Sequence, residues 1–193
     1  ELALRTTLGP IGPDEAGLIL PHEHILTDLR GPSHPQYGQA DLDDVSRVMR
    51  PLLEQAKTAG VGVLIECSSI GVGRNPTASE RLSRETGLPI VFPTGVYGRG
   101  EFVPAEFEAM SEDALTAWMV GELENGVAGT PLRAGFIKIA ADKEPLNEFQ
   151  KRQLRAAARA SIRTGAAIAS HTPSGARAIE QAEQRIFDSI DLA

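Results

Sequence analysis

The stretch "LILPHEHILTDLR", residues 18–30, decides between the folds that the rest of the chain leaves open. It begins as an apolar run and places two of the chain's four histidines, His22 and His24, one residue apart. On a β-strand, side chains two positions apart share a face, so the two imidazoles would lie together and Glu23 would face away. Two neutral imidazoles on one face can ligate a divalent metal ion, and a pair of hydrogen-bonded structural histidines is the alternative.

On the C-terminal side of this stretch, amphipathic helical segments alternate with short apolar runs. Four of the helical segments end in a small or polar residue followed by glycine, as in "KTAGVGVLIE" and "RTGAAIASH". Glycine just past a helix end adopts the left-handed cap conformation without a Cβ penalty. Asp41 and the pair Asn75 and Pro76 are residues typical of helix starts. We predict five strands, near residues 18–24, 61–67, 89–95, 134–140 and 166–171, and we expect the last four, which follow the helical segments, to be buried.

Strands that alternate with helices imply parallel pairing through right-handed crossovers. Two architectures fit this pattern: a doubly wound sheet, or part of an eight-stranded barrel. A doubly wound cofactor-binding domain would carry a glycine-rich turn directly after the first strand, where "PHEHILTD" stands instead. We therefore predict an α/β fold of the (β/α)8 TIM-barrel type, with about five βα units in a single partial domain over residues 1–193.

The composition excludes several classes of function. The 26 acidic residues outnumber the 19 basic ones, and no cluster of Lys and Arg forms a track for phosphate backbones, so we expect no nucleic-acid partner. No apolar run approaches the roughly 20 residues of a membrane span, and the N-terminus lacks the regions of a signal peptide. We therefore expect no membrane association and a cytoplasmic location. Cys67 is the single cysteine, so there is no intrachain disulfide framework.

Two further residues strengthen the metal interpretation of His22 and His24. His171 ends the predicted last strand, and the carboxyl ends of parallel strands meet at the edge where α/β proteins build their sites. Lys138 lies in "GFIKIAAD" between two isoleucines, and a lysine in a buried strand is costly unless its charge is neutralised or paired. A lysine that reaches solvent at a strand end is the alternative. His34, in a loop rich in Pro and Gly, is expected to be solvated.

Taken in order, five stretches resemble the phosphotriesterase-related branch of the amidohydrolase superfamily. They are "GPIGPDEAGLILPHEH", "ECSSIGVGRNP", "PTGVY", "GELENGVAGTPLRAGFIKIA" and "AAARASIRTGAAIASHTPSG", and they cover nearly the whole chain. Members of that family fold as distorted (β/α)8 barrels and hold two divalent metals, usually zinc, bridged by a carboxylated lysine. The resemblance implies that His22 and His24 bind the more buried metal and His171 the more exposed one. It also implies that Lys138 is the bridging carbamate, with a catalytic role.

The activity that the resemblance implies is metal-assisted hydrolysis, in which an activated water attacks a carbonyl or phosphoryl centre. Tyr97 in "TGVY" resembles the substrate-side tyrosine of the lactonase-like members. We therefore expect the partner to be a small-molecule lactone or other ester, with a phosphotriester second. A tyrosine that only packs at the barrel rim is the structural alternative.

The resemblance stops after His171. In the family, a histidine from strand six and an aspartate from strand eight complete the two metal sites, whereas the sequence here continues into one helix. Five strands cannot close a barrel, which typically takes about 250 residues, so we expect an N-terminal portion that is inactive alone. Its open edges favour self-association into a homo-oligomer. The alternative from another class is a non-catalytic half-barrel that binds metal or serves in assembly.

Overall fold

The structure is a computed structural model of the chain and describes residues 3–190. Its central strands are β3 (Leu18–Glu23), β4 (Val61–Glu66), β5 (Ile90–Val91), β6 (Pro93–Thr94), β7 (Phe136–Ala140) and β8 (Ile168–His171). The main helices are α1 (Leu42–Thr58), α2 (Pro76–Thr86), α4 (Glu112–Glu124), α5 (Glu148–Thr164) and α6 (Gly175–Ile190). The hairpin of β1 (Leu4–Thr6) and β2 (Gly9–Ile11) precedes them, and the 3-10 helix η1 (Gly100–Phe102) and α3 (Ala105–Glu108) follow β6.

The central strands pair in the order in which they occur along the chain. β3 pairs with β4 and β4 with β5, while β6 pairs with β7 and β7 with β8, all in parallel. Phe92 alone separates β5 from β6, so the predicted third strand is interrupted at that residue. A doubly wound sheet reverses its strand order at a switch point, and the described strands show no reversal. This order confirms the prediction of a partial (β/α)8 fold.

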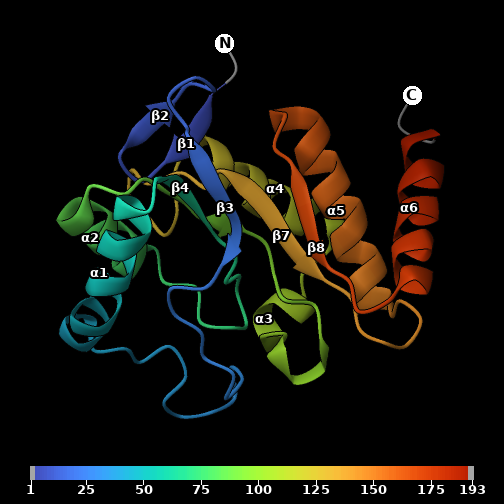
Figure 1. Cartoon of the computed structure of the whole chain (residues 1–193). Helices are drawn as coiled ribbons and strands as arrows, with labels where there is room; N and C mark the ends of the chain where they lie inside the picture. The colour runs from blue at the N-terminus through green and yellow to red at the C-terminus, as the bar shows by residue number, and fades with distance from the viewer. Residues whose placement is uncertain (1–2, 191–193) are drawn as a thin grey trace.

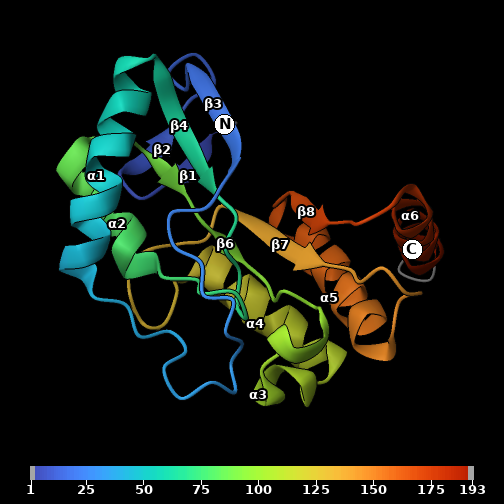
Figure 2. The ribbon, with the colours of Figure 1, turned by 60° about the horizontal axis from the view of Figure 1, so that its bottom comes forward.

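The helices cover the outer side of the strands. α1 and α2 pack against β4 and β5, α4 and α5 pack against β6, β7 and β8, and α6 lies beside α5 (Figures 1 and 2). Apolar clusters fill the space between the layers; one contains Leu53, Leu82 and Ile90, and another contains Met119, Ile137 and Leu154. Within residues 3–190, none of the helices has both the length and the apolar character needed to cross a membrane.

Local sequence signals explain where several helices begin and end. The side chains of Asp41 and Asn75 accept backbone N–H groups in the first turns of α1 and α2. Gly87 (φ 63°) and Gly165 (φ 74°) end α2 and α5 in the left-handed conformation. These contacts confirm the predicted starts of α1 and α2 and the predicted ends of α2 and α5.

The strands differ from the prediction in a few places. The β1–β2 hairpin has no counterpart among the predicted strands, because each of its strands has three residues, too few for a periodic pattern. β3 ends at Glu23, so His24 lies just after the strand and not within it. The fourth and fifth predicted strands begin at Phe136 and Ile168, later than the expected 134 and 166.

β3 and β8 are the edges of the strand array. Within the described residues, β3 pairs with β4 only and β8 with β7 only, which agrees with the open edges that the sequence predicts. Leu18 is 57% exposed and Ile19 is 36% exposed, which agrees with an edge strand whose apolar side chains meet water. A strand that lacks a neighbour on one side leaves its apolar side chains in contact with water.

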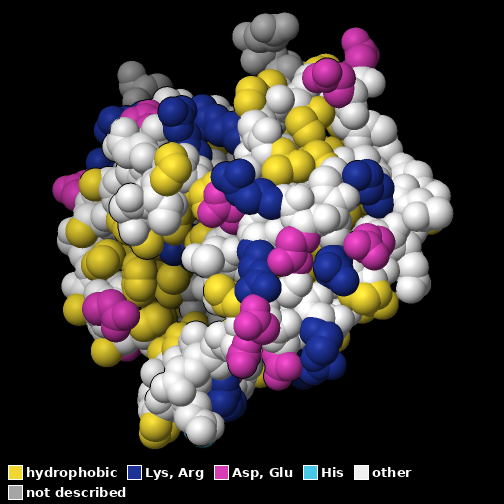
Figure 3. Space-filling model, turned by 90° about the vertical axis from the view of Figure 1, so that its left-hand side faces the viewer, with side chains coloured by type: hydrophobic (Ala, Val, Ile, Leu, Met, Phe, Trp, Pro, Cys, Tyr) yellow, Lys and Arg dark blue, Asp and Glu magenta, His cyan; other side chains and the backbone are white. Residues whose placement is uncertain are grey.

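Hydrophobic side chains also gather among charged ones on the face viewed from the side of α1 and α2 (Figure 3).

Candidate metal centre

The predicted site residues lie on the strands or directly after them. His22 is the residue before the end of β3, His24 follows that end, and His171 is the last residue of β8. The rings of His22 and His24 lie edge to face, with centroids 5.3 Å apart. The two imidazoles therefore lie together, as predicted, although His24 lies just after the strand.

His171 lies against Tyr97, which follows β6. The centroids of their rings are 5.4 Å apart. Partial loss of hydration against neighbouring atoms is the main cause that lowers the pKa of each of the three histidines, and the charge of Lys138 lowers each of them further. In His171, the charge of Arg99 has a larger effect than that of Lys138. A lowered pKa keeps an imidazole neutral, which is the form that ligates metals.

Lys138 is buried, unlike the histidines of the predicted metal site. It lies in the middle of β7 and is 3% exposed, which disagrees with the alternative of a lysine at the end of a strand. Its side-chain amine forms no hydrogen bond or ion pair with any described residue. Burial lowers the pKa of its amine. A buried, unpaired amine is costly in a structural role, and in neutral form it is a nucleophile that can add CO2, so its chemistry fits a bridging carbamate.

The described part of the chain does not enclose a metal ion by itself. Among the side chains that the structure describes, those of residues 3–184, no group of three or more His, Cys, Asp or Glu is close enough to hold one. His22 and His24 are exposed. The donors that are present therefore fit part of a metal site. His34 is also exposed, as predicted for a loop residue.

Ser68, which is not among the predicted site residues, orients the ring of His24. Its Oγ lies 2.9 Å from Nδ1 of His24 and also donates to the carbonyl of Leu26 at 2.9 Å. A hydroxyl has a single proton, so when Ser68 donates it to Leu26, the hydrogen between Ser68 and His24 is the one on Nδ1. This assignment leaves the Nε2 lone pair of His24 free for a ligand.

Glu66, at the end of β4, forms hydrogen bonds with the segments that carry His24 and Ser68. It too is absent from the predicted site. It is 4% exposed, and its carboxylate accepts the backbone N–H groups of Ile25 and Ser68. Its Oε1 lies 3.9 Å from Nδ1 of His24, and burial raises its pKa. The signal that could have found it is "VLIEC", in which an acidic residue ends a buried strand. Burying a carboxylate is costly unless hydrogen bonds compensate it, as they do for Glu66.

We predict that Ser68→Ala weakens zinc binding by about 10- to 100-fold, because His24 loses the partner that fixes its tautomer. Isothermal titration calorimetry measures the affinity, and 15N NMR of the metal-free chain reports the tautomer directly. Ser69→Ala is the matched control, since Ser69 is fully buried and its hydroxyl has no hydrogen-bond partner among the described residues. Equal affinities in the two variants would show that Ser68 does not position His24.

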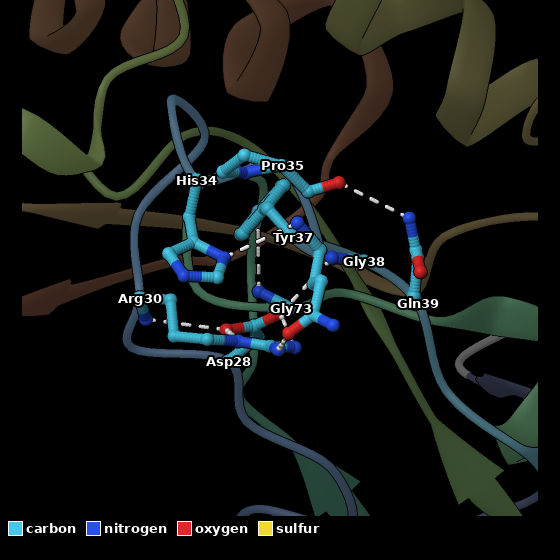
Figure 4. A network of polar contacts seen from close by, with 9 residues as sticks. Asp28, Arg30, His34, Pro35, Tyr37, Gly38, Gln39 and Gly73 are labelled. Carbon is cyan, nitrogen blue, oxygen red and sulfur yellow. Dashed lines mark hydrogen bonds and ion pairs between the residues drawn. The ribbon is translucent and has the colours of Figure 1, made fainter.

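The loop between β3 and α1 is held over the neighbouring loop by Asp28 and Tyr37 (Figure 4). The carboxylate of Asp28 pairs with Arg30 at 2.7 Å and accepts the N–H of Gly38 at 3.0 Å. The hydroxyl of Tyr37 accepts the N–H of Gly73 at 3.3 Å. Gly73 has φ +91°, and a Cβ there would lie 2.5 Å from the backbone nitrogen of Asp28. The loop that carries His24 is therefore fixed at several points.

In Asp28→Asn, the free energy of unfolding is expected to fall less steeply as the pH is lowered than it does in wild type. Hydrogen bonds from Arg30 hold the pKa of Asp28 well below its usual range. The carboxylate therefore stabilises the fold above its unfolded pKa of about 4, and this contribution is lost as pH falls from there through the lowered pKa. Urea unfolding at neutral pH and at several acidic values measures the change, with the exposed Asp14→Asn as control. Identical pH slopes in wild type and Asp28→Asn would contradict the prediction.

The strand order and these side chains define a class of protein. The chain is a (β/α)8-type protein with imidazoles at the carboxyl ends of its strands and a buried lysine within them, and sites of this fold lie at that edge. The sequence pattern of the phosphotriesterase family matches residues 2–192, and the chain belongs to that family. The family match confirms the resemblance noted in the sequence.

Two relatives illustrate the range of the family. The chain is 34% identical over 203 residues to the phosphotriesterase homology protein of Mycobacterium tuberculosis (strain ATCC 25618 / H37Rv), covering 98% of this chain and 61% of the relative. It is 29% identical over 196 residues to the N-acetyltaurine hydrolase of Danio rerio, covering 87% of this chain and 56% of that protein. The chain thus spans less than two thirds of the length of these relatives.

Two solved structures superpose on 97% of the chain. One is a variant of the organophosphorus hydrolase from Deinococcus radiodurans, with a TM-score of 0.87, 28% identity and 58% of that chain covered. The other comes from the engineering of organophosphate hydrolysis activity from a weak promiscuous lactonase template, with a TM-score of 0.86, 27% identity and 60% covered. Both agree with a partial barrel.

Proposed function

We propose that the chain carries part of a binuclear metal centre that hydrolyses lactones or other carboxylic esters. Lys138 is the observation that supports this most directly. It is buried without a partner, and its charge acts on His22, His24 and His171. A purely structural role would favour an apolar residue at this position, because burying an unpaired amine costs stability.

In this proposal, His22 and His24 would hold one divalent ion, His171 would hold a second, and carboxylated Lys138 would be shared between them. The amine of Lys138 adds CO2 to form a carbamate and releases a proton, which replaces a buried cation with an anion suited to two cations. Zinc is the ion we propose, because neutral imidazole nitrogens suit it. When bound, the ions would supply Lewis-acid polarisation of the ester carbonyl and activation of water.

Tyr97 supports a carboxylic ester as the substrate. Its half-buried ring contacts the rings of His171 and Phe102, whose centroids lie 5.4 Å and 5.8 Å away. This aromatic surface beside His171 can pack against the apolar part of a lactone or acyl chain. One superposed structure derives from a template described as a weak promiscuous lactonase, which supports the same substrate class.

Metal analysis together with a substrate panel tests the proposal in the protein made from the complete reading frame that encodes this chain. We expect two zinc ions per polypeptide, faster hydrolysis of lactones and aryl esters than of dialkyl aryl phosphates, and a carbamate signal after supply of 13C-bicarbonate. The 193-residue chain, assayed in parallel, is expected to be inactive. A folded protein with at most one weakly held metal and no hydrolysis would favour the non-catalytic half-barrel instead.

A further inference from the structure

Arg99 follows Tyr97 in the loop after β6, and its guanidinium group is incompletely paired. Its two side-chain contacts, with Oδ1 of Asp142 and the hydroxyl of Tyr97, are both 3.5 Å long, near the outer limit for a hydrogen bond. Its Nε is buried without a hydrogen-bond partner among the described residues. The same Oδ1 of Asp142 accepts the backbone N–H of Lys143 at 2.9 Å. A guanidinium has five N–H donors, and the four on the terminal nitrogens of Arg99 make only these two long contacts.

The backbone that carries Arg99 is fixed by buried contacts. The carbonyl of Gly98 accepts a hydrogen bond of 2.6 Å from Nε2 of Gln150, and the N–H of Tyr97 donates to the carbonyl of Ile70 at 2.7 Å. Gly98 leaves little room for a side chain, because a Cβ there would lie 2.9 Å from the carbonyl oxygen of Ala140 as well as against the amide of Gln153. Arg99 thus projects from a segment that is ordered without a ligand, which lowers the entropy cost of binding one.

Arg99 lies one aromatic ring away from the candidate metal centre. Its Cζ is 5.9 Å from the centroid of the Tyr97 ring, whose other neighbours include His171. The side chain of Arg99 is 31% exposed, so a ligand can approach its free N–H groups. In a chain with a net charge of −7, a cation of this kind gives the edge a local preference for anions.

We propose that Arg99 binds an oxyanion, a carboxylate or a phosphate, carried by the same substrate molecule as the hydrolysed ester. The planar fork of a guanidinium can donate two parallel hydrogen bonds to either group. Asp142 takes the place of the anion in the free protein and competes with it. The inference rests on the proposed function, because it names the class of ester that the same site accepts: one with a negative charge close to the bond that is cleaved.

Anion binding to the metal-free 193-residue chain tests Arg99 separately from hydrolysis. Glutarate and phenyl phosphate are titrated against neutral glutaramide, with the Nε–H signal of Arg99 followed by 1H–15N NMR. We expect both anions, and not glutaramide, to shift that signal, and the tighter anion identifies the preferred group. Affinity should fall about tenfold or more in Arg99→Gln and less in Arg99→Lys, because charge-assisted bidentate bonds are lost. Asp142→Asn should raise it.

Arg163→Gln is the matched control, since Arg163 is an exposed arginine on α5 and its removal changes the net charge equally. It should leave the affinity for both anions unchanged. Equal affinity in wild type and Arg99→Gln would overturn the proposal. So would a loss of the same size in Arg163→Gln, which would show that only the total charge matters.

Hydrolysis by the protein from the complete reading frame then separates this inference from the proposed function. The ratio of kcat/KM for 4-nitrophenyl hydrogen glutarate to that for its neutral methyl ester should fall about tenfold in Arg99→Gln, mainly through KM. If wild type hydrolyses neither ester while glutarate binding still depends on Arg99, the hydrolase proposal fails and the anion site stands. If both esters are hydrolysed and the ratio is unchanged, the anion site is overturned and the hydrolase stands.

Discussion

Replacing Lys138 with methionine is expected to stabilise the metal-free chain while abolishing its metal binding. Lys138 is 3% exposed and has no partner among the described residues, so the fold bears the desolvation cost of an amine. Methionine has a similar length and no polar group, and removing an unsatisfied polar group is worth about 1–3 kcal/mol. Urea unfolding in the presence of a chelator measures this gain. With zinc added, wild type should become the more stable of the two proteins, because only wild type gains the binding free energy.

The functional half of this prediction is the loss of hydrolysis in Lys138→Met of the protein from the complete reading frame, down to the uncatalysed rate. Lys143→Met is the control, since Lys143 is exposed and an exposed substitution changes stability by within about 0.5 kcal/mol. A Lys138→Met variant that binds two metals with wild-type affinity would show that the lysine is no bridge. A destabilised apo variant would show instead that the amine has a structural role.

The features of the fold that could be predicted from the sequence are those set by residues close together in the chain. Caps such as Asn75 and Gly87 act on residues within one turn, so the sequence shows them directly. The interruption of the third strand is different, because β5 pairs with β4 while β6 pairs with β7. That change of partner is set by neighbours far along the chain, and the run "PIVFPT" looks continuous. Pro93, which lacks an N–H for the ladder, was its only local sign.

Some residues of the candidate site could likewise be predicted from local sequence, and others could not. His22 and His24 are two residues apart, and Lys138 is a charged residue in an apolar run, so each carries its own signal. Ser68 contacts His24 across 44 positions of sequence, and no spacing rule predicts such a pair. Arg99 becomes notable only because its partners are too distant, which sequence does not show. Contacts between loops therefore need the structure.

The contacts of Glu122 on α4 are also not visible in the sequence. Glu122 lies on a helix face whose other residues are apolar and buried in the core. Its carboxylate forms two hydrogen bonds with Arg74, at 2.5 Å and 2.8 Å, and accepts a third from the hydroxyl of Thr94 at 2.6 Å. The side chains of Arg74 and Glu122 are 8% and 7% exposed. Arg74 also donates to the carbonyl of Pro93 at 3.2 Å and stacks over Trp118. The pair thus joins the loop after β4 to β6 and α4.

Glu122→Ala is expected to destabilise the chain by about 3–5 kcal/mol, because it leaves the charge of Arg74 buried without a partner. Urea unfolding of the metal-free chain measures the loss. Glu80→Ala, which removes an ion pair with the exposed Arg84, should cost no more than about 0.5 kcal/mol. The double variant Arg74→Met with Glu122→Leu should recover most of the loss, since well-packed apolar residues can replace a buried pair. If the double variant is as unstable as Glu122→Ala, the pair acts through packing that Met and Leu do not reproduce, and the unpaired charge is not the cause.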